Sequence, residues 1–160
     1  MKRFFILTLA LLTYAIAFAQ LNVTSKSTKV ERIGSARMGV VAVEMSITGA
    51  DTAVFISSQS TNNIDKRYVF FLGRSPKAAF ATICDLVKLF DQMETKSAIS
   101  VKDAFDEDFV ITKKTVLGAL CLSFKTTGYL GTCDLGKSEI IKCKDVIKDY
   151  FNFQEPETTD

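Results

Sequence analysis

The chain has 160 residues and no histidine, and its 20 lysines and arginines nearly balance 18 aspartates and glutamates. This length suits one domain with an ordinary hydrophobic core. The lack of histidine excludes every catalytic triad, dyad or metal centre that needs an imidazole. The near-neutral charge argues against nucleic acid as a main partner, because that binding scales with the number of phosphates neutralised.

Residues 1–19 have the pattern of a cleavable secretory signal. Two cationic residues precede an apolar run over 4–18, which ends in the small-x-small sequence Ala17-Phe18-Ala19. The run is shorter than the roughly 20 apolar residues that span a bilayer, which disfavours an uncleaved anchor. We therefore predict cleavage between Ala19 and Gln20, a secreted or periplasmic mature chain, and no membrane span in it. The acceptor pattern Asn22-Val23-Thr24 matters only in a host that glycosylates asparagine.

The mature part is predicted to be one small α+β domain over residues 20–153, followed by a frayed acidic tail, 154–160. Its first half has the alternation and turn residues of short strands joined by short connections, which favours an antiparallel meander. The predicted features are an edge strand between 21 and 30, a turn at Gly34-Ser35, strands at 36–47, 52–58 and 68–72, and a polar loop from Gln59 to Lys66.

A helix is predicted from about 76 to 92. Ser75 can cap the first backbone amides, and Pro76 is tolerated at the first helical position. Apolar residues then recur at helical spacing, while charged residues occupy the opposite side.

The second half repeats the change from strands to a helix. Short strands are predicted at 99–101 and 109–112, and a longer one at 116–125. A three-residue turn at 126–128 leads to a strand at 129–135, and a final helix covers about 138–151. The fold class is therefore α+β, with a largely antiparallel, meander-like sheet and two amphipathic helices packed on one face.

One string matches a nucleotide-binding loop. Gly131, Gly136, Lys137 and Ser138 satisfy the pattern G-x-x-x-x-G-K-[ST], in which backbone amides and the lysine hold phosphates. Only 22 residues follow Ser138, too few for the later parallel strands of that fold. The residues before the string indicate a hairpin. We interpret the string as a strand leading into a helix, and we predict no nucleotide or other cofactor.

Four cysteines remain after cleavage, and an even number in an exported chain favours disulfides. With a three-residue turn, Cys121 lies opposite Cys133 on adjacent antiparallel strands, so this pair is the first choice for a bridge. A two-residue turn would place the two thiols on opposite faces. Cys84 and Cys143, on the two helices, are the second choice. They are alternatively small buried apolar residues.

Two weaker clusters carry charge. Asp103, Asp106, Glu107 and Asp108 provide oxygen ligands for calcium, but their spacing matches no EF-hand and a solvated acidic loop is favoured. Arg74, Ser75 and Lys77 flank the start of the first helix, where a weak anion site is possible and an ordinary helix cap is favoured. We predict no metal site. No C-x-x-C pair indicates zinc.

These observations favour an exported, non-catalytic domain that binds an unidentified protein or small molecule. The aromatic strand Arg67–Phe71 and the polar loop from Gln59 to Lys66 are natural places for a contact surface, although aromatic strands usually belong to the core. The alternative is a small extracytoplasmic hydrolase that uses carboxylates, with Asp85, Asp103 and Asp106 as its candidate acids. The sequence identifies no base or metal to accompany them.

Overall fold

The computed structural model describes residues 27–37, 40–60, 67–126 and 132–154. Within these ranges the α+β class is confirmed, but the strands form two four-stranded antiparallel sheets rather than one. The first sheet contains β1 (Thr28–Arg37), β2 (Val41–Thr48), β3 (Asp51–Gln59) and β4 (Arg67–Gly73); the second contains β5 (Ala98–Lys102), β6 (Asp108–Val116), β7 (Ala119–Thr126) and β8 (Cys133–Gly136). The helices are α2 (Pro76–Gln92) and α3 (Lys137–Phe151).

The first sheet is a meander in the order β1-β2-β3-β4. The predicted turn at Gly34-Ser35 is wrong, because both residues lie inside β1 where its pairing with β2 shifts register. A Cβ added to Gly34 would lie 2.4 Å from Cγ1 of Val146 on α3. The glycine is therefore needed for close packing of the strand against the helix.

The second sheet is also a meander, β5-β6-β7-β8. The predicted strand at 116–125 begins too early, since Leu117 and Gly118 form a two-residue turn between β6 and β7. Both residues have positive φ, 50° and 83°, which is the backbone of a type I′ hairpin turn.

Both predicted helices are confirmed. Ser75 caps α2, and its side chain accepts a hydrogen bond from the N–H of Ala78 at 3.2 Å. At the start of α3, a carboxylate oxygen of Glu139 accepts the N–H of Gly136 at 2.9 Å, so the first turn is capped by a side chain within the helix.

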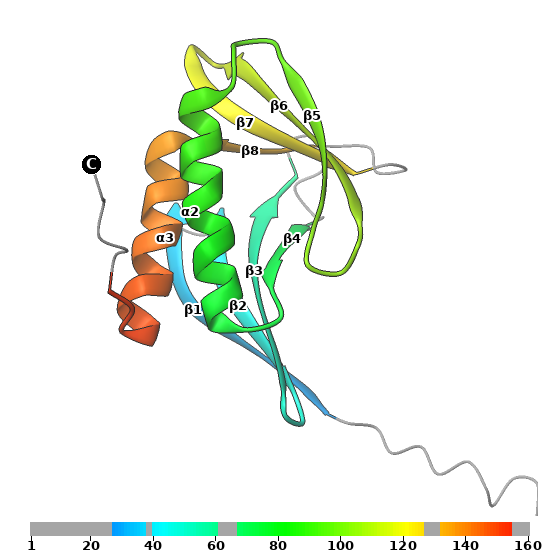
Figure 1. The fold of residues 1–160 in the computed structure, drawn as a ribbon, viewed down its shortest axis with the longest axis vertical. Coiled ribbons are helices and arrows are strands. Elements are labelled where there is room, and N and C mark those ends of the chain that lie inside the picture. The colour runs from blue at the N-terminus through cyan, green and yellow to red at the C-terminus, as the bar shows by residue number, and fades with distance from the viewer. Residues whose placement is uncertain (1–26, 38–39, 61–66, 127–131, 155–160) are drawn as a thin grey trace, which may run out of the picture.

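The helices form one layer over the two sheets (Figure 1). They lie side by side, with α3 against β1 and β8 and α2 against β4. The hydrophobic core lies between the helices and the sheets. Phe70 of β4 joins the two sheets through ring contacts with Phe109 and Phe124, at 4.9 and 5.1 Å between centroids. The buried residues of the two sheets therefore belong to one hydrophobic core.

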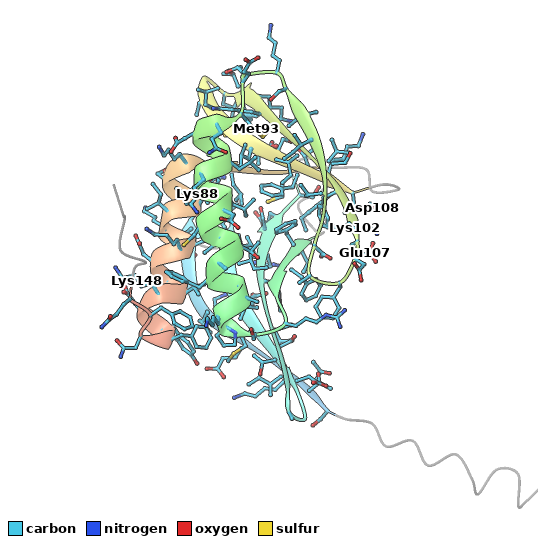
Figure 2. All side chains as sticks on the ribbon, viewed as in Figure 1. Lys88, Met93, Lys102, Glu107, Asp108 and Lys148 are labelled. Atoms are coloured by element: carbon cyan, nitrogen blue, oxygen red, sulfur yellow. The ribbon has the colours of Figure 1, made fainter. Side chains whose placement is uncertain are left out.

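A buried lysine lies at the end of this core, next to the C-terminus of α2. Lys113 of β6 is 8% exposed, and its ammonium donates to the carbonyl oxygens of Phe90 and Met93 at 2.6 and 2.8 Å. These carbonyls belong to the end of α2 (Figure 2 labels Met93), where helix groups lack intrahelical partners and a cation is favourable.

No helix in the described ranges has the length and apolar character to cross a membrane. The predicted signal, the Asn22 acceptor pattern and the tail from 155 lie outside the described residues.

Candidate functional site

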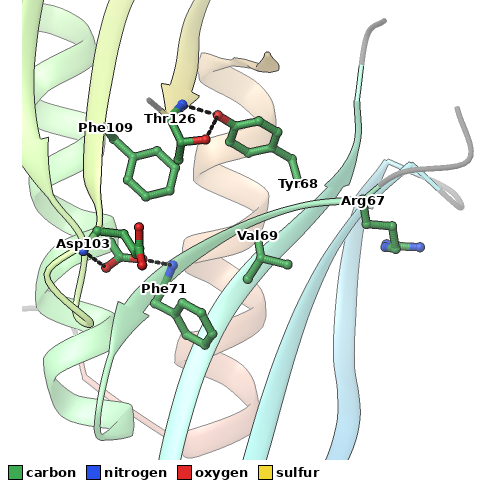
Figure 3. A pocket seen from close by; sticks show the side chains of 8 residues that line it. Arg67, Tyr68, Val69, Phe71, Asp103, Phe109 and Thr126 are labelled. Atoms are coloured by element: carbon green, nitrogen blue, oxygen red, sulfur yellow. Dashed lines mark hydrogen bonds between the residues drawn. The ribbon is translucent and has the colours of Figure 1, made fainter. Parts of the chain in front are cut away.

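A hollow of about 270 Å³ opens where the two sheets meet, along the outer edge of β4 (Figure 3). Four residues of β4 line one side, and the other side comes from the segment after β5 and from β6 and β7. The lining residues are Arg67, Tyr68, Val69, Phe71, Asp103, Glu107, Phe109 and Thr126. The predicted contact strand Arg67–Phe71 therefore forms one wall, while the polar loop 61–66 lies outside the described residues.

The side chains of β4 alternate about this edge. Tyr68 points toward the second sheet, and Val69 and Phe71 point to the opposite side. The Tyr68 hydroxyl donates to Oγ1 of Thr126 at 3.0 Å and accepts the N–H of the same residue. This contact attaches the end of β7 to β4 and sets the depth of the hollow.

Asp103 organises the segment that forms the other wall. It is 8% exposed, and one carboxylate oxygen accepts the N–H groups of Phe105 and Glu107 at 2.8 and 3.1 Å. The other oxygen accepts the N–H of Phe71 at 3.4 Å. A buried carboxylate that accepts three backbone amides acts as a structural anchor, because it satisfies backbone groups that burial would otherwise leave without partners.

The segment that Asp103 holds is also attached to β4 by its backbone. The N–H of Ala104 donates to the carbonyl oxygen of Phe71 at 3.2 Å. Figure 2 shows Glu107 and Asp108 at this side of the molecule with Lys102 close by, and the Lys102 ammonium lies 3.9 Å from the Asp108 carboxylate. Within this segment, Asp103 is therefore buried and bonded to backbone amides, whereas Asp108 is exposed and lies near the Lys102 ammonium.

The structure does not gather the predicted acids. Asp85 lies on an exposed face of α2 and pairs with Lys88 at 3.3 Å, whereas Asp103 is buried after β5 and Asp106 is exposed with a φ of 66°. Among the described residues, which include Asp103 to Asp108, no three Cys, Asp or Glu side chains gather into a metal site.

The predicted anion cluster is divided among other contacts. The Ser75 side chain accepts an amide of its own helix. Arg74 turns to the segment after β5, where Nε donates to the carbonyl oxygen of Ala104 at 2.9 Å and the guanidinium lies 4.6 Å from the Phe105 ring centroid. Lys77 is exposed. The geometry supports the helix-cap interpretation over an anion pocket.

The nucleotide-binding string also has other partners. Lys137 pairs with Asp91 of α2 at 2.5 Å, and the N–H of Gly136 donates to Glu139. The preceding strand β8 pairs antiparallel with β7. Ser138 is an exposed residue of α3, and Gly131 lies outside the described residues. The amide and the cation that would hold phosphates are engaged within the chain.

The predicted register of β7 and β8 is wrong. Cys121 lies opposite Gly136, and Cys133 lies opposite Phe124. This is a slip of three residues, and an odd slip places Cys121 and Cys133 on opposite faces of the sheet. Neither this bridge nor the one between Cys84 and Cys143 forms, because the structure describes all four cysteines and contains no disulfide.

The three buried cysteines, Cys121, Cys133 and Cys143, are unsuited to act as nucleophiles. Burial raises the pKa of Cys133 and of Cys143 to about 12, against 9.0 for an ordinary thiol. Burial also raises the pKa of Cys121, and the carboxylates of Asp134 and Glu139 raise it further. A thiol with a raised pKa has little of the thiolate form that reacts.

Sequence reasoning located β4 and named Asp103 and Glu107 as acidic residues, but it did not place them opposite β4, and it missed Phe109 and Thr126. Phe109 and Thr126 lie far from β4 in the sequence and look like ordinary strand residues. The one available signal was the position of Asp103 directly after a strand, where aspartate often binds backbone amides.

Neither models of known protein families nor curated proteins match this sequence.

Proposed function

We propose that this chain is an exported, non-catalytic domain that binds a partner in the hollow beside β4. The main support is the chemistry of the hollow's walls. The half-buried side chains of Val69 and Phe71 supply the accessible apolar surface, and the buried rings of Tyr68 and Phe109 back it. The enclosed polar groups of Asp103 and Tyr68 are used in internal hydrogen bonds. Such a site offers contact area and shape and contains no assembled reactive group.

The size of the hollow supports the same conclusion. Its volume of about 270 Å³ is just below the roughly 300–1,000 Å³ typical of sites that enclose a small molecule. It suits part of a larger partner. The exposed ends of Arg67 and Glu107 stand at its border with opposite charges, so the partner meets an apolar centre with a charged rim.

The alternative carboxylate enzyme has no specific observation in its favour. Asp85 and Asp103 lie on different elements with different partners, and the carboxylate of Asp103 accepts three backbone amides. A hydrolase that uses two carboxylates holds them on either side of the scissile bond, and these residues are not arranged in that way.

A fragment screen by NMR tests the binding proposal. The ¹⁵N-labelled chain is titrated with a library of small aromatic and peptide-like fragments. We expect shifts at the amides of Tyr68, Val69 and Thr126. The variant Phe109→Ala should weaken these hits, whereas Val110→Ala, a change at an exposed neighbour, should not.

An activity panel tests the alternative. Chromogenic esters, phosphate esters and glycosides are incubated with the purified chain and with Asp103→Asn. Turnover that the substitution abolishes while the fold persists would contradict the non-catalytic proposal.

A further inference from the structure

The outer edge of β4 is half covered by the chain itself. At Phe71 the N–H donates to Asp103 and the C=O accepts the N–H of Ala104, so both backbone groups point away from β3. The segment after β5 therefore occupies this part of the edge in the way that a neighbouring strand would.

Two residues earlier, no described segment covers the same edge. Backbone groups alternate along an antiparallel strand, and residues two apart point the same way. Phe71 pairs with Phe55 and Val69 with Ser57 in an unbroken register, so the N–H and C=O of Val69 also point away from β3. In the described part of the chain no hydrogen bond reaches these two groups, and Val69 lines the hollow.

We propose, building on the binding function above, that the occupant is an extended peptide segment of a partner protein, which adds to β4 as a fifth strand at Val69. A peptide backbone offers an acceptor and a donor at the spacing that an edge residue requires, and strand addition is an established mode of peptide recognition. An exposed edge is otherwise a liability that proteins cover.

The side chains beside Val69 specify the peptide. In an antiparallel segment, the orientation of every strand pair here, the residue opposite Val69 lies on the side of Val69 and Phe71 and is apolar. The peptide residues before and after it point toward Tyr68 and Phe109. Both of these side chains are buried, so the peptide residues that face them are small. The residue two positions later lies opposite Arg67 and is acidic. Arg67 is exposed and donates to Ser57 at 2.9 Å, and its guanidinium has further donors to offer.

A second copy of the chain suits this edge less well. Pairing of β4 with β4 would need two flat edges, but this edge lies inside a hollow bounded by Glu107 and Thr126. A single extended segment can enter such a recess. Two copies that approached each other through this recess would collide at the residues that bound it before their β4 strands could pair.

The probe is the peptide acetyl-Ile-Ala-Glu-Ser-amide, with isoleucine intended to lie opposite Val69, so that the peptide ends before Phe71, where Asp103 and Ala104 already occupy the edge. We expect saturable shifts at the amides of Val69 and Thr126 in the ¹⁵N-labelled chain. N-methylation of the isoleucine removes the donor to the C=O of Val69 and should weaken binding about tenfold, the effect of one hydrogen bond. N-methylation of the following alanine, whose N–H points away from β4, should change little.

Arg67→Gln tests the acidic preference. It should weaken binding of the peptide about threefold, as expected for an exposed ion pair, and leave binding of a peptide with glutamine in place of glutamate unaffected.

Equal binding of both N-methylated peptides, or no shift with any peptide, would overturn strand addition. If fragments still bind the hollow in that case, the proposed function stands, and if they do not it fails as well. Shifts at Val69 that depend on protein concentration alone would assign the edge to a second copy and also overturn the proposal.

Discussion

Single buried polar side chains determine where the elements of this domain end. Lys113 stabilises the last turn of α2 through two carbonyls, and Asp103 holds the segment after β5 through three amides. Asp103 directly follows the strand β5, and Lys113 interrupts the apolar pattern of β6. A lysine inside a strand with 8% exposure is rare unless its ammonium is satisfied.

Removing the ammonium of Lys113 should destabilise the fold. Lys113→Met keeps the apolar stem but leaves the carbonyls of Phe90 and Met93 without their donor. We expect a loss of about 1–3 kcal/mol in the free energy of unfolding, measured by urea titration. Lys125→Met, at an exposed position of β7, is the matched control and should change it by no more than about 0.5 kcal/mol. Equal midpoints for the two variants would contradict this role for Lys113.

The buried thiols give the stability a pH dependence. The pKa of Cys143 is about 12 in the folded chain, against an ordinary value of 9.0. The unfolded chain therefore releases this proton at lower pH than the folded chain does. The resulting stabilisation is complete below pH 9 and is lost as pH rises from about 9 to 12.

We expect the free energy of unfolding of the reduced protein to fall above pH 9, with up to about 1.4 kcal/mol per pH unit from Cys143. Cys143→Val should have a shallower slope between pH 9 and 11, since other titrating groups affect both proteins equally. Identical slopes in urea titrations at pH 7.5, 9, 10 and 11 would show that Cys143 does not contribute.

Close packing between β1 and α3 depends on the absence of a Cβ at Gly34. In Gly34→Ala the new Cβ would lie 2.4 and 2.7 Å from the two methyl carbons of Val146. Overpacking of this kind costs about 1–3 kcal/mol. We expect Val146→Ala to recover part of this loss, so that the double-mutant cycle gives a favourable coupling.

Gly73→Ala provides the comparison for that cycle. Its Cβ would lie 2.4 Å from the backbone nitrogen of Ala79, which no side-chain change relieves. Unfolding measurements should therefore show additive effects of Gly73→Ala and Val146→Ala. Additivity of Gly34→Ala and Val146→Ala as well would indicate that β1 and α3 move apart instead of clashing.

The start of α3 provides a test of the nucleotide-binding string. Lys137→Ala removes the ion pair with Asp91, which is partly exposed at both ends, and should cost no more than about 1 kcal/mol. Calorimetry should detect no saturable binding of Mg²⁺-ATP to either protein, because Glu139 already accepts the N–H of Gly136. A nucleotide affinity that the substitution abolishes would reverse our interpretation of the string.

Elements with local signals were predictable, and pairing across long connections was not. The α2 bounds followed from Ser75-Pro76 and helical periodicity. The register of β7 with β8 did not follow, because Cys121 to Phe124 are all buried and both faces of β7 are covered. Alternation carries no register information on such a strand. The hollow required this same long-range pairing, so the sequence indicated β4 but not Phe109 or Thr126.

At the scale of the whole molecule, the two helices stabilise two sheets that have few backbone contacts with each other. The sheets meet through Phe70 and its neighbours and through the bonds of Tyr68 and Asp103. The hollow lies at this junction. A change at the junction is therefore expected to affect both binding and the free energy of unfolding, and binding variants need stability measurements beside them.

Export remains a prediction, and the arrangement of the described domain suggests its test. The first strand begins at Thr28, eight residues after the predicted first mature residue, Gln20. Removal of residues 1–19 therefore takes away no described strand or helix. When the chain is expressed with its own signal, we expect the soluble fraction of the export compartment to contain a species whose intact mass corresponds to a start at Gln20. This species should have the same unfolding midpoint as the purified uncleaved chain, residues 1–160. A full-length species that sediments with membranes would contradict cleavage, and a lower midpoint for the processed chain would show that residues before Gln20 stabilise the domain.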